Sequence, residues 1–212
     1  MSEIKPQLPT DTWIVGTWDQ YMQTIDNRVD EKAKTYYHNG QMRVEMPPVG
    51  NDHASDQTII ISAIGIFVAT KGIDMNGKDN CTYQKIGLDA QPDVSYYIGE
   101  NANIIPYGTS IINLDIYPPP NLVIEVAHNS LADDKGEKRL IYEDLGVAEY
   151  WIVDVQNVQI IAFAMENGGS RRITQSQVLS GLSITLLNEA LQRTRLMNHG
   201  QVCAWLLTEF QQ

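Results

Sequence analysis

The segment Pro118–Asp154 constrains the fold most, because its pattern is a buried strand, a helix and a second buried strand. Asn121–Val126 is almost entirely apolar and follows three prolines, as is typical of a strand covered on both faces. Glu149–Val155 repeats this pattern after Gly146, a residue type that commonly ends helices. Two covered strands joined by a helix predict that both lie side by side in the interior of a sheet.

The helix between these strands has a recognisable start. Asn129 or Ser130 can serve as its N-cap, and Asp133 and Asp134 suit the positive end of the helix dipole. Lys138 follows one to two turns into the helix, on a side chain long enough to reach back toward the first strand.

Glu125 is the one acid in the first of these strands. A carboxylate in a buried strand is costly unless something compensates its charge. Either a metal ion or a nearby lysine would do so, and Lys138 is a candidate for the second.

The rest of the chain indicates an α/β (α+β) fold, with a central mixed sheet flanked by helices. We expect an N-terminal arm over residues 1–16, with residues 1–12 loose, and a single domain over 17–212 that includes a C-terminal helix. The expected helices are 17–25, 51–70, 182–191 and 196–210. The expected strands are a hairpin over 34–46 that turns at Asn39–Gly40, then 81–86, 92–98, 158–165 and 171–175. Residues 71–80 and 99–119 are expected to be irregular connections.

Charge and cysteine content bear on the partners and the compartment. The formal net charge is −11, which does not favour nucleic-acid binding, although a metal-filled cleft can attract phosphate on an acidic protein. Cys81 and Cys203 have no metal-ligand spacing and indicate reduced thiols. No signal peptide is recognisable, and the longest apolar run, Ile59–Ala69, is too short to cross a bilayer. We therefore expect a cytoplasmic protein without membrane contact.

The sequence LVIEVAHNS, together with GEKRLIYEDLGVAEYWIVD further along the chain, resembles the Uma-two family of bacterial restriction endonuclease-like proteins. Two further segments add to the resemblance: QPDVSYY at Gln91–Tyr97 and NGQMRVEMPPVGNDH at Asn39–His53. The resemblance extends over residues 18 to 190. That family belongs to the PD-(D/E)XK nuclease-like superfamily, so it implies a restriction-endonuclease-like fold and a metal-dependent endonuclease acting on DNA.

The resemblance also implies which residues bind metal. Asp93, Glu125 and the backbone carbonyl of Val126 would hold Mg²⁺ or Mn²⁺, which prefer such hard oxygen ligands. Glu45 would be a further ligand. His53 would be a ligand, a base or a capping residue, and we favour a structural or supporting role for it.

The third catalytic element would be a lysine. In the superfamily it stands two residues after the acid, but here that position is Ala127. The resemblance implies that Lys138 takes this role on the helix, with Lys135 as its competitor, to position the attacking water or neutralise charge on the phosphate. The alternative for Lys138 is an ordinary helical pair with Asp134 on a solvated face.

Two functions remain open at this point. The first is a metal-dependent DNA hydrolase, and the second is a binding or interaction module that kept the nuclease fold. The missing lysine of the usual motif and the acidic surface favour the second, whereas Asp93, Glu125 and Lys138 together favour the first. We also expect a homodimer, since the C-terminal helix is rich in large apolar residues and a two-fold dimer suits cleavage of both DNA strands.

Overall fold

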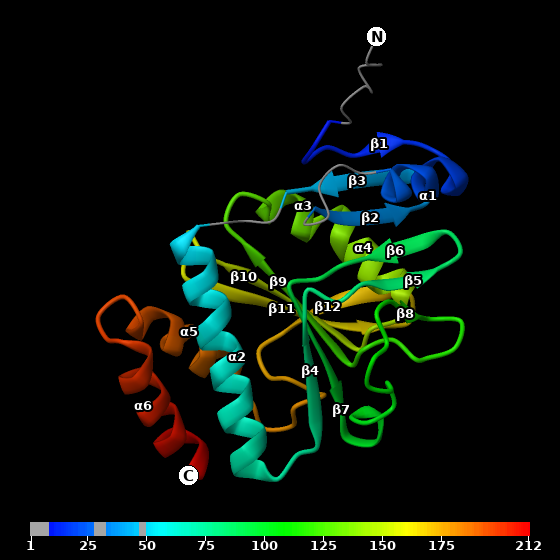
Figure 1. Cartoon of the computed structure of the whole chain (residues 1–212). Coiled ribbons are helices and arrows are strands. Elements are labelled where there is room, and N and C mark those ends of the chain that lie inside the picture. The colour runs from blue at the N-terminus through cyan, green and yellow to red at the C-terminus, as the bar shows by residue number, and fades with distance from the viewer. Residues whose placement is uncertain (1–8, 28–32, 47–49) are drawn as a thin grey trace.

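Two six-stranded mixed sheets form the centre of the protein (Figure 1), seen in a computed structural model that describes residues 9–27, 33–46 and 50–212. The first sheet runs β1 (Ile14–Val15), β3 (Gln41–Glu45), β2 (Lys34–His38), β6 (Leu88–Ala90), β5 (Tyr83–Lys85) and β8 (Ile112–Asn113). The second runs β12 (Gly169–Ile173), β11 (Gln159–Glu166), β10 (Glu149–Asp154), β9 (Leu122–Ala127), β7 (Val94–Ile98) and β4 (Met75–Asp79). The helices are α1 (Trp18–Asp26), α2 (Asn51–Lys71), the 3₁₀ turn η1 (Gly99–Asn101), α3 (Leu131–Lys135), α4 (Glu137–Leu145), α5 (Ile184–Arg193) and α6 (His199–Gln211).

Strands β9 and β10 lie in the interior of the second sheet, as the sequence predicted. They pair in parallel, with Val123 opposite Tyr150, and α3 and α4 connect them. Every residue of both strands is buried. The predicted mixed α/β fold with flanking helices is therefore confirmed, although its strands form two sheets rather than one.

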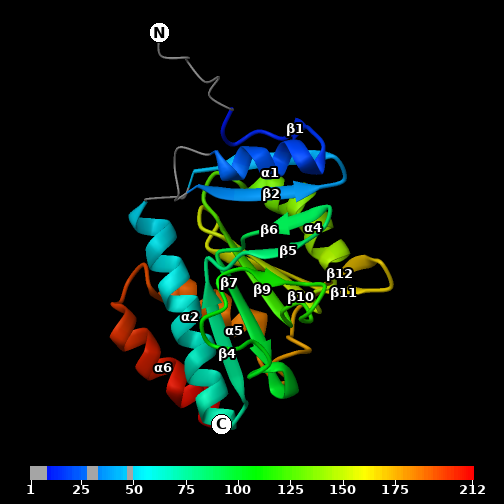
Figure 2. The same ribbon diagram turned by 45° about the vertical axis from the view of Figure 1, so that its right-hand side comes forward.

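The two faces of the second sheet have different neighbours. Helices α2 and α5 lie on one face with α6 packed against α2, and Ile59, Leu187 and Leu206 belong to the same core as Ile124 (Figures 1 and 2). The other face packs against α4 and the first sheet through a second core. Since side chains alternate along a strand, Glu125 points away from Ile124, toward this second core.

The predicted hairpin and first helix are confirmed. Strands β2 and β3 pair antiparallel around the Asn39–Gly40 turn, where both residues have positive φ. Thr17 caps α1 in a capping box with Gln20. Of the expected arm, residues 1–8 lie outside the described residues, while Ile14–Val15 forms β1 against β3.

Four features of the structure differ from the sequence prediction. Residues 71–80 contain strand β4, which has little strand character of its own but pairs with five residues of β7. Its Gly77 leaves room for the Tyr96 ring, since a Cβ there would be 3.0 Å from a ring carbon. Residues 99–119 contain η1 and β8, and the short strand β6 was not predicted. The single helix expected before Gly146 is broken at Gly136 into α3 and α4.

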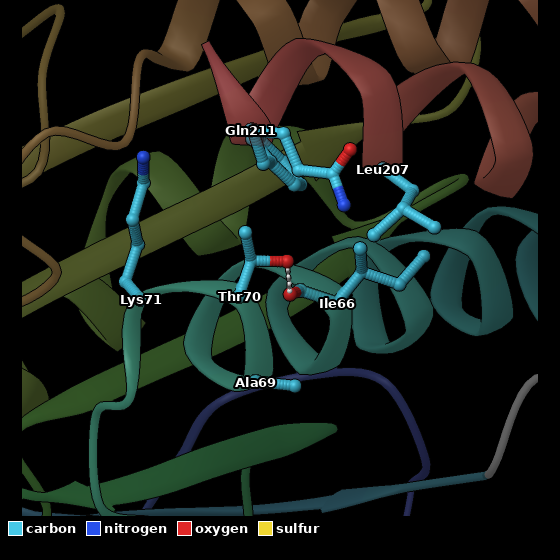
Figure 3. A pocket seen from close by; sticks show the side chains of 7 residues that line it. Ile66, Ala69, Thr70, Lys71, Leu207 and Gln211 are labelled. Carbon is cyan, nitrogen blue, oxygen red and sulfur yellow. Dashed lines mark hydrogen bonds between the residues drawn. The ribbon is translucent and has the colours of Figure 1, made fainter.

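A hollow of about 590 Å³ lies between the C-terminal ends of α2 and α6 (Figure 3). The Leu207 and Ile66 side chains border it, and the Thr70 hydroxyl donates to the Ile66 carbonyl oxygen at 2.7 Å rather than into the hollow. Phe210 of α6 packs edge-on against Phe67 at 5.1 Å between ring centroids. Among the described residues, no helix is long and apolar enough to cross a membrane.

Candidate functional site

Glu125 lies at the bottom of the candidate site, with 1% of its surface exposed. The Tyr142 hydroxyl donates to Glu125 Oε1 at 2.6 Å, and the Tyr36 hydroxyl donates to the same oxygen at 3.3 Å. Burial, together with the negative charge of Asp93, outweighs the attraction of Lys138 and raises the pKa of Glu125 to about 8. The carboxyl group is therefore costly to ionise in this position.

Asp93 is buried immediately before β7. The antiparallel register that pairs Val94 with Ile124 continues to place Asp93 opposite Glu125. Asp93 Oδ1 forms a buried ion pair with the Lys34 ammonium, and Oδ2 accepts a hydrogen bond from the Val126 backbone N–H at 2.7 Å. Burial alone would raise the pKa of Asp93, but Lys34 and His53 together outweigh burial and hold that pKa well below its ordinary value.

Lys138 projects from α4 into the same cluster and is 1% exposed. Its ammonium lies 3.0 Å from Glu45 Oε2, 3.1 Å from Asp134 Oδ1 and 3.8 Å from Glu125 Oε2. It also lies 4.8 Å from the centroid of the Tyr36 ring. Burial opposes the positive charge, but the surrounding carboxylates outweigh it and raise the pKa of Lys138 well above its ordinary value. The helical pair with Asp134 that the sequence suggested is present, but it is buried rather than solvated.

Glu45 is the last residue of β3, and its carboxylate contacts the Lys138 ammonium. Besides Lys138, it accepts a hydrogen bond from Arg43 Nε at 3.3 Å. The same Arg43 nitrogen is 3.6 Å from Asp133, which accepts a hydrogen bond from the Trp13 indole at 2.5 Å. Burial would raise the pKa of Glu45, but Lys138, Arg43 and Lys34 together lower it overall.

His53 stands in the first turn of α2, near Asp93. Its Nε2 lies 3.5 Å from Asp93 Oδ2, and its side chain is 7% exposed. Nε2 makes no hydrogen bond within the described part of the chain. His53 is therefore close to the predicted cluster, at the side where α2 begins.

These residues surround a hollow of about 570 Å³ that is open to solvent on one side. The predicted residues Glu45, His53, Asp93, Val126 and Lys138 line it, while Glu125 lies beneath. A smaller hollow of about 290 Å³, lined by Lys34 and Gln57 among others, adjoins it across His53 and Asp93. The cluster is thus accessible to a ligand from outside.

One predicted candidate lies elsewhere, and several members of the cluster were not predicted. Lys135 is exposed and does not line either hollow, so the break between α3 and α4 separates it from Lys138. The sequence analysis did not identify Lys34, Tyr36 or Tyr142, which contact Asp93 and Glu125. The only available signal was Lys34 at the start of a strand whose residues are otherwise suited to burial.

The donor chemistry of the cluster fits a divalent cation, since Asp93 and Glu125 supply hard carboxylate oxygens from neighbouring strands. The raised pKa of Glu125 is consistent with a cation as the missing stabilising charge. However, the ammonium groups of Lys34 and Lys138 already lie beside these acids, which disfavours a cation there. Among the residues described, no three His, Cys, Asp or Glu side chains are gathered closely enough to form a metal site by themselves.

The fold is that of a nuclease-like protein. A crystal structure from Anabaena variabilis, described as "a putative nuclease", matches with a TM-score of 0.57 and 18% sequence identity, covering 82% of this chain and 98% of that one. The family model Uma2, described as "Putative restriction endonuclease", matches residues 18–210. The chain therefore belongs to the Uma2 family, which is the family that the sequence resembled. No curated protein matches the chain.

Proposed function

We propose that this protein is a metal-dependent endonuclease of the PD-(D/E)XK type that hydrolyses DNA phosphodiester bonds. One observation carries the proposal: Asp93 and Glu125 stand opposite each other beside a solvent-open hollow, and the buried Lys138 ammonium points into the same cluster. Membership of the Uma2 family supports it.

Each residue has a role that follows from its contacts. Glu45 and Asp134 hold the Lys138 ammonium in place, so that its charge can orient the attacking water or offset the negative charge that develops on the phosphate. Tyr142 and Tyr36 both donate to Glu125 Oε1, which leaves Oε2 on the side of Lys138. The site is therefore largely preorganised before substrate binds.

Asp93 and Glu125 would hold one Mg²⁺ or Mn²⁺, with the Val126 carbonyl and Glu45 as further oxygen ligands. When bound, the cation would supply an activated water and stabilise negative charge on the phosphate. Because Glu125 must lose its proton to bind a cation, we expect the affinity for metal to rise with pH up to about 8.

The binding test is a Mn²⁺ titration by calorimetry of the wild type and of Glu125→Gln. We expect the variant, which removes one carboxylate but keeps its shape, to lose most of the affinity. Glu149→Gln is unsuitable as a control because that acid is part of the core. The matched control is Glu143→Gln, an acid of α4 that does not line either hollow. Equal Mn²⁺ binding by the wild type and Glu125→Gln would exclude this metal site.

The activity test uses plasmid DNA with Mg²⁺ or Mn²⁺. We expect Lys138→Met to retain Mn²⁺ binding but lose cleavage rate, because the lysine acts on charge that develops in the transition state. Lys135→Met removes an exposed lysine one turn away and should cleave like the wild type.

The second candidate is a binding module that retains the nuclease fold without catalysis. The observation that favours it is that lysines already occupy the positions beside both acids. In that case the wild type would bind neither Mn²⁺ nor Mg²⁺, and purified protein would leave plasmid DNA intact at every metal concentration.

A further inference from the structure

Lys34 is a second buried lysine in the acid cluster, and the proposed reaction gives it no role. It is the first residue of β2, and 3% of its surface is exposed. Its ammonium forms an ion pair with Asp93 Oδ1, and its positive charge also favours the ionised forms of Glu45 and Glu125. The ammonium therefore lies among the three acids that we propose as metal ligands.

The two oxygens of the Asp93 carboxylate are held by different kinds of partner. Oδ2 accepts a hydrogen bond from the Val126 N–H at 2.7 Å, and His53 Nε2 lies 3.5 Å from the same oxygen. The Val126 N–H belongs to the backbone of β9, an interior strand, so it cannot move away without disturbing the sheet. Oδ1 is held by the end of a flexible lysine side chain. Lys34 is therefore the partner of Asp93 that another cation can replace.

Lys138 is more firmly held than Lys34. Its ammonium lies 3.0 Å from Glu45 and 3.1 Å from the buried Asp134, and it also lies over the Tyr36 ring. Moving it would leave Asp134 without its cation, which is costly for a buried carboxylate. Among the described residues, Lys34 has one ion-pair partner, Asp93. Of the two lysines, Lys34 is thus the one that can leave the cluster.

The smaller hollow gives the Lys34 ammonium a place to go. Lys34 and Asp93 both line this hollow, and so does Asp79. The Asp79 carboxylate is exposed, and its Oδ1 accepts hydrogen bonds from the neutral side chains of Gln57 at 2.7 Å and Asn80 at 3.1 Å. An ammonium that leaves Asp93 can therefore remain hydrated in the hollow and lie near another acid.

We propose that Lys34 is a tethered cation that occupies the Asp93 side of the metal site in the metal-free protein, and that a divalent cation binds by displacing the Lys34 ammonium toward Asp79. The inference rests on the proposed function, because it concerns the same metal site. It explains why carboxylates that suit a metal already have a lysine beside them. The lysine compensates the buried Asp93 charge before metal arrives, and in consequence it weakens metal binding.

The first test is a calorimetric titration with Mn²⁺ above pH 8, where Glu125 is ionised. We expect Lys34→Met, which removes the charge, to bind Mn²⁺ about tenfold more tightly than the wild type. Lys34→Arg keeps the charge and should bind no more tightly than the wild type. The control Lys135→Met removes an exposed lysine that lines neither hollow, so its affinity should be unchanged. Equal or weaker binding by Lys34→Met would overturn the proposal.

Thermal unfolding separates this role from a purely structural ion pair. In a chelator we expect Lys34→Met to be less stable than the wild type, because Asp93 is left unpaired. Mn²⁺ should then raise the Tm of Lys34→Met by more than it raises the Tm of the wild type, because the variant binds the metal more tightly. A structural role alone predicts the same rise in both proteins, and that result would contradict the proposal.

The wild type can be tested directly, without relying on a variant that has to fold. Protein labelled with ¹³C at the lysine ε carbon is titrated with Mg²⁺, which is diamagnetic, and the Lys34 signal is assigned by its loss in Lys34→Arg. We expect the Lys34 signal to move with the same Mg²⁺ dependence as binding measured by calorimetry. Binding of Mg²⁺ without any change in the Lys34 signal would show that the lysine stays in place.

The destination of the ammonium is tested with Asp79→Asn. We expect this change to weaken Mn²⁺ binding roughly two- to threefold in the wild type and to have less effect when Lys34 is replaced by Met. Equal effects in both backgrounds would overturn the displacement toward Asp79. If neither the wild type nor Lys34→Met bound Mn²⁺, the proposed metal site would fail and this inference with it. If both bound Mn²⁺ equally, only this inference would fail.

Discussion

Glu125 and Glu149 are equally buried acids in neighbouring strands, but their surroundings differ. Glu149 is satisfied by donors from Trp151, Ser176 and the backbone of residues 177 and 178. Glu125 receives two tyrosine hydroxyls, and its pKa is raised to about 8. Glu149 therefore serves the fold, whereas Glu125 is costly to ionise, a cost that a bound cation would relieve.

The raised pKa of Glu125 predicts how stability depends on pH. The folded protein keeps this proton up to about pH 8, while the unfolded chain releases it near the ordinary value of 4.5. The stabilisation is thus complete below about pH 4.5 and is lost as pH rises through about 8. Glutamine cannot ionise, so Glu125→Gln does not lose this stabilisation as pH rises. We expect its unfolding free energy relative to wild type to increase between these pH values by on the order of 2–4 kcal/mol.

Urea unfolding at several pH values, in the presence of a chelator, measures this difference directly. Asp93 and Glu45 have lowered pKa values, so their effect on stability falls at lower pH and is shared by both proteins. A difference between Glu125→Gln and wild type that does not change with pH would show that Glu125 is already ionised in the fold.

Lys138 is predicted to stabilise the protein as well as to act in the reaction. Lys138→Met keeps most of the side-chain volume but leaves Glu45, Asp134 and Glu125 without their shared cation. We expect a loss of about 3–5 kcal/mol in the free energy of unfolding. The exposed Lys135→Met should change it by less than about 0.5 kcal/mol. Chemical denaturation of both variants tests this, and similar values for the two would contradict the buried cluster.

The sequence could predict part of this site. Glu125 stood out because an acid interrupted a buried strand, and family resemblance added Asp93, Glu45, His53 and Lys138. The partners of Asp93 and Glu125 could not be predicted, since Lys34 and Tyr36 come from a strand of the other sheet. A single sequence contains no signal for which two sheets face each other. Glu149 also shows that the burial of an acid does not by itself identify a functional site.

At the scale of elements, strands and helices with a strong hydrophobic pattern were predicted best. Strands β9 and β10 and helix α2 agree closely with the sequence analysis. Strand β4 was missed because its residues, MNGKD, have no hydrophobic alternation, and it forms through pairing with β7. The division between α3 and α4 was missed because the helical pattern continues across Gly136, although this break separates Lys135 from Lys138.

An ion pair between a buried acid and a partly exposed arginine links α2 to the segment between α5 and α6. The Arg195 guanidinium forms two hydrogen bonds with Asp56 of α2, at 2.6 and 2.7 Å, and Asp56 is fully buried. We expect Arg195→Ala to destabilise the protein by about 3 kcal/mol, because it leaves a buried carboxylate unpaired. Arg171→Ala, which removes an exposed pair with Glu166, should cost less than about 1 kcal/mol. Thermal unfolding compares the two, and equal effects would contradict this role of Arg195.

At the scale of the whole molecule, the homodimer remains a prediction. Leu206 and Phe210 of α6 are buried in the core, so they are not available for a dimer interface. Leu207, by contrast, is exposed beside the hollow in Figure 3. We expect sedimentation velocity at micromolar concentration to show a dimer, and Leu207→Glu to shift it toward monomer by placing a charge on that surface. A wild-type protein that sediments only as a monomer would contradict the prediction.

The segment that precedes α1 has a practical consequence. Asp11 lines the hollow, and the Trp13 indole is held by Asp133 and lies 5.9 Å from Arg43. A bulky label attached to this segment, for example at residue 11, would therefore stand at the mouth of the site. The carboxyl end lies at the far end of the molecule in both views (Figures 1 and 2), so immobilising the protein there leaves the hollow open for metal and nucleic acid.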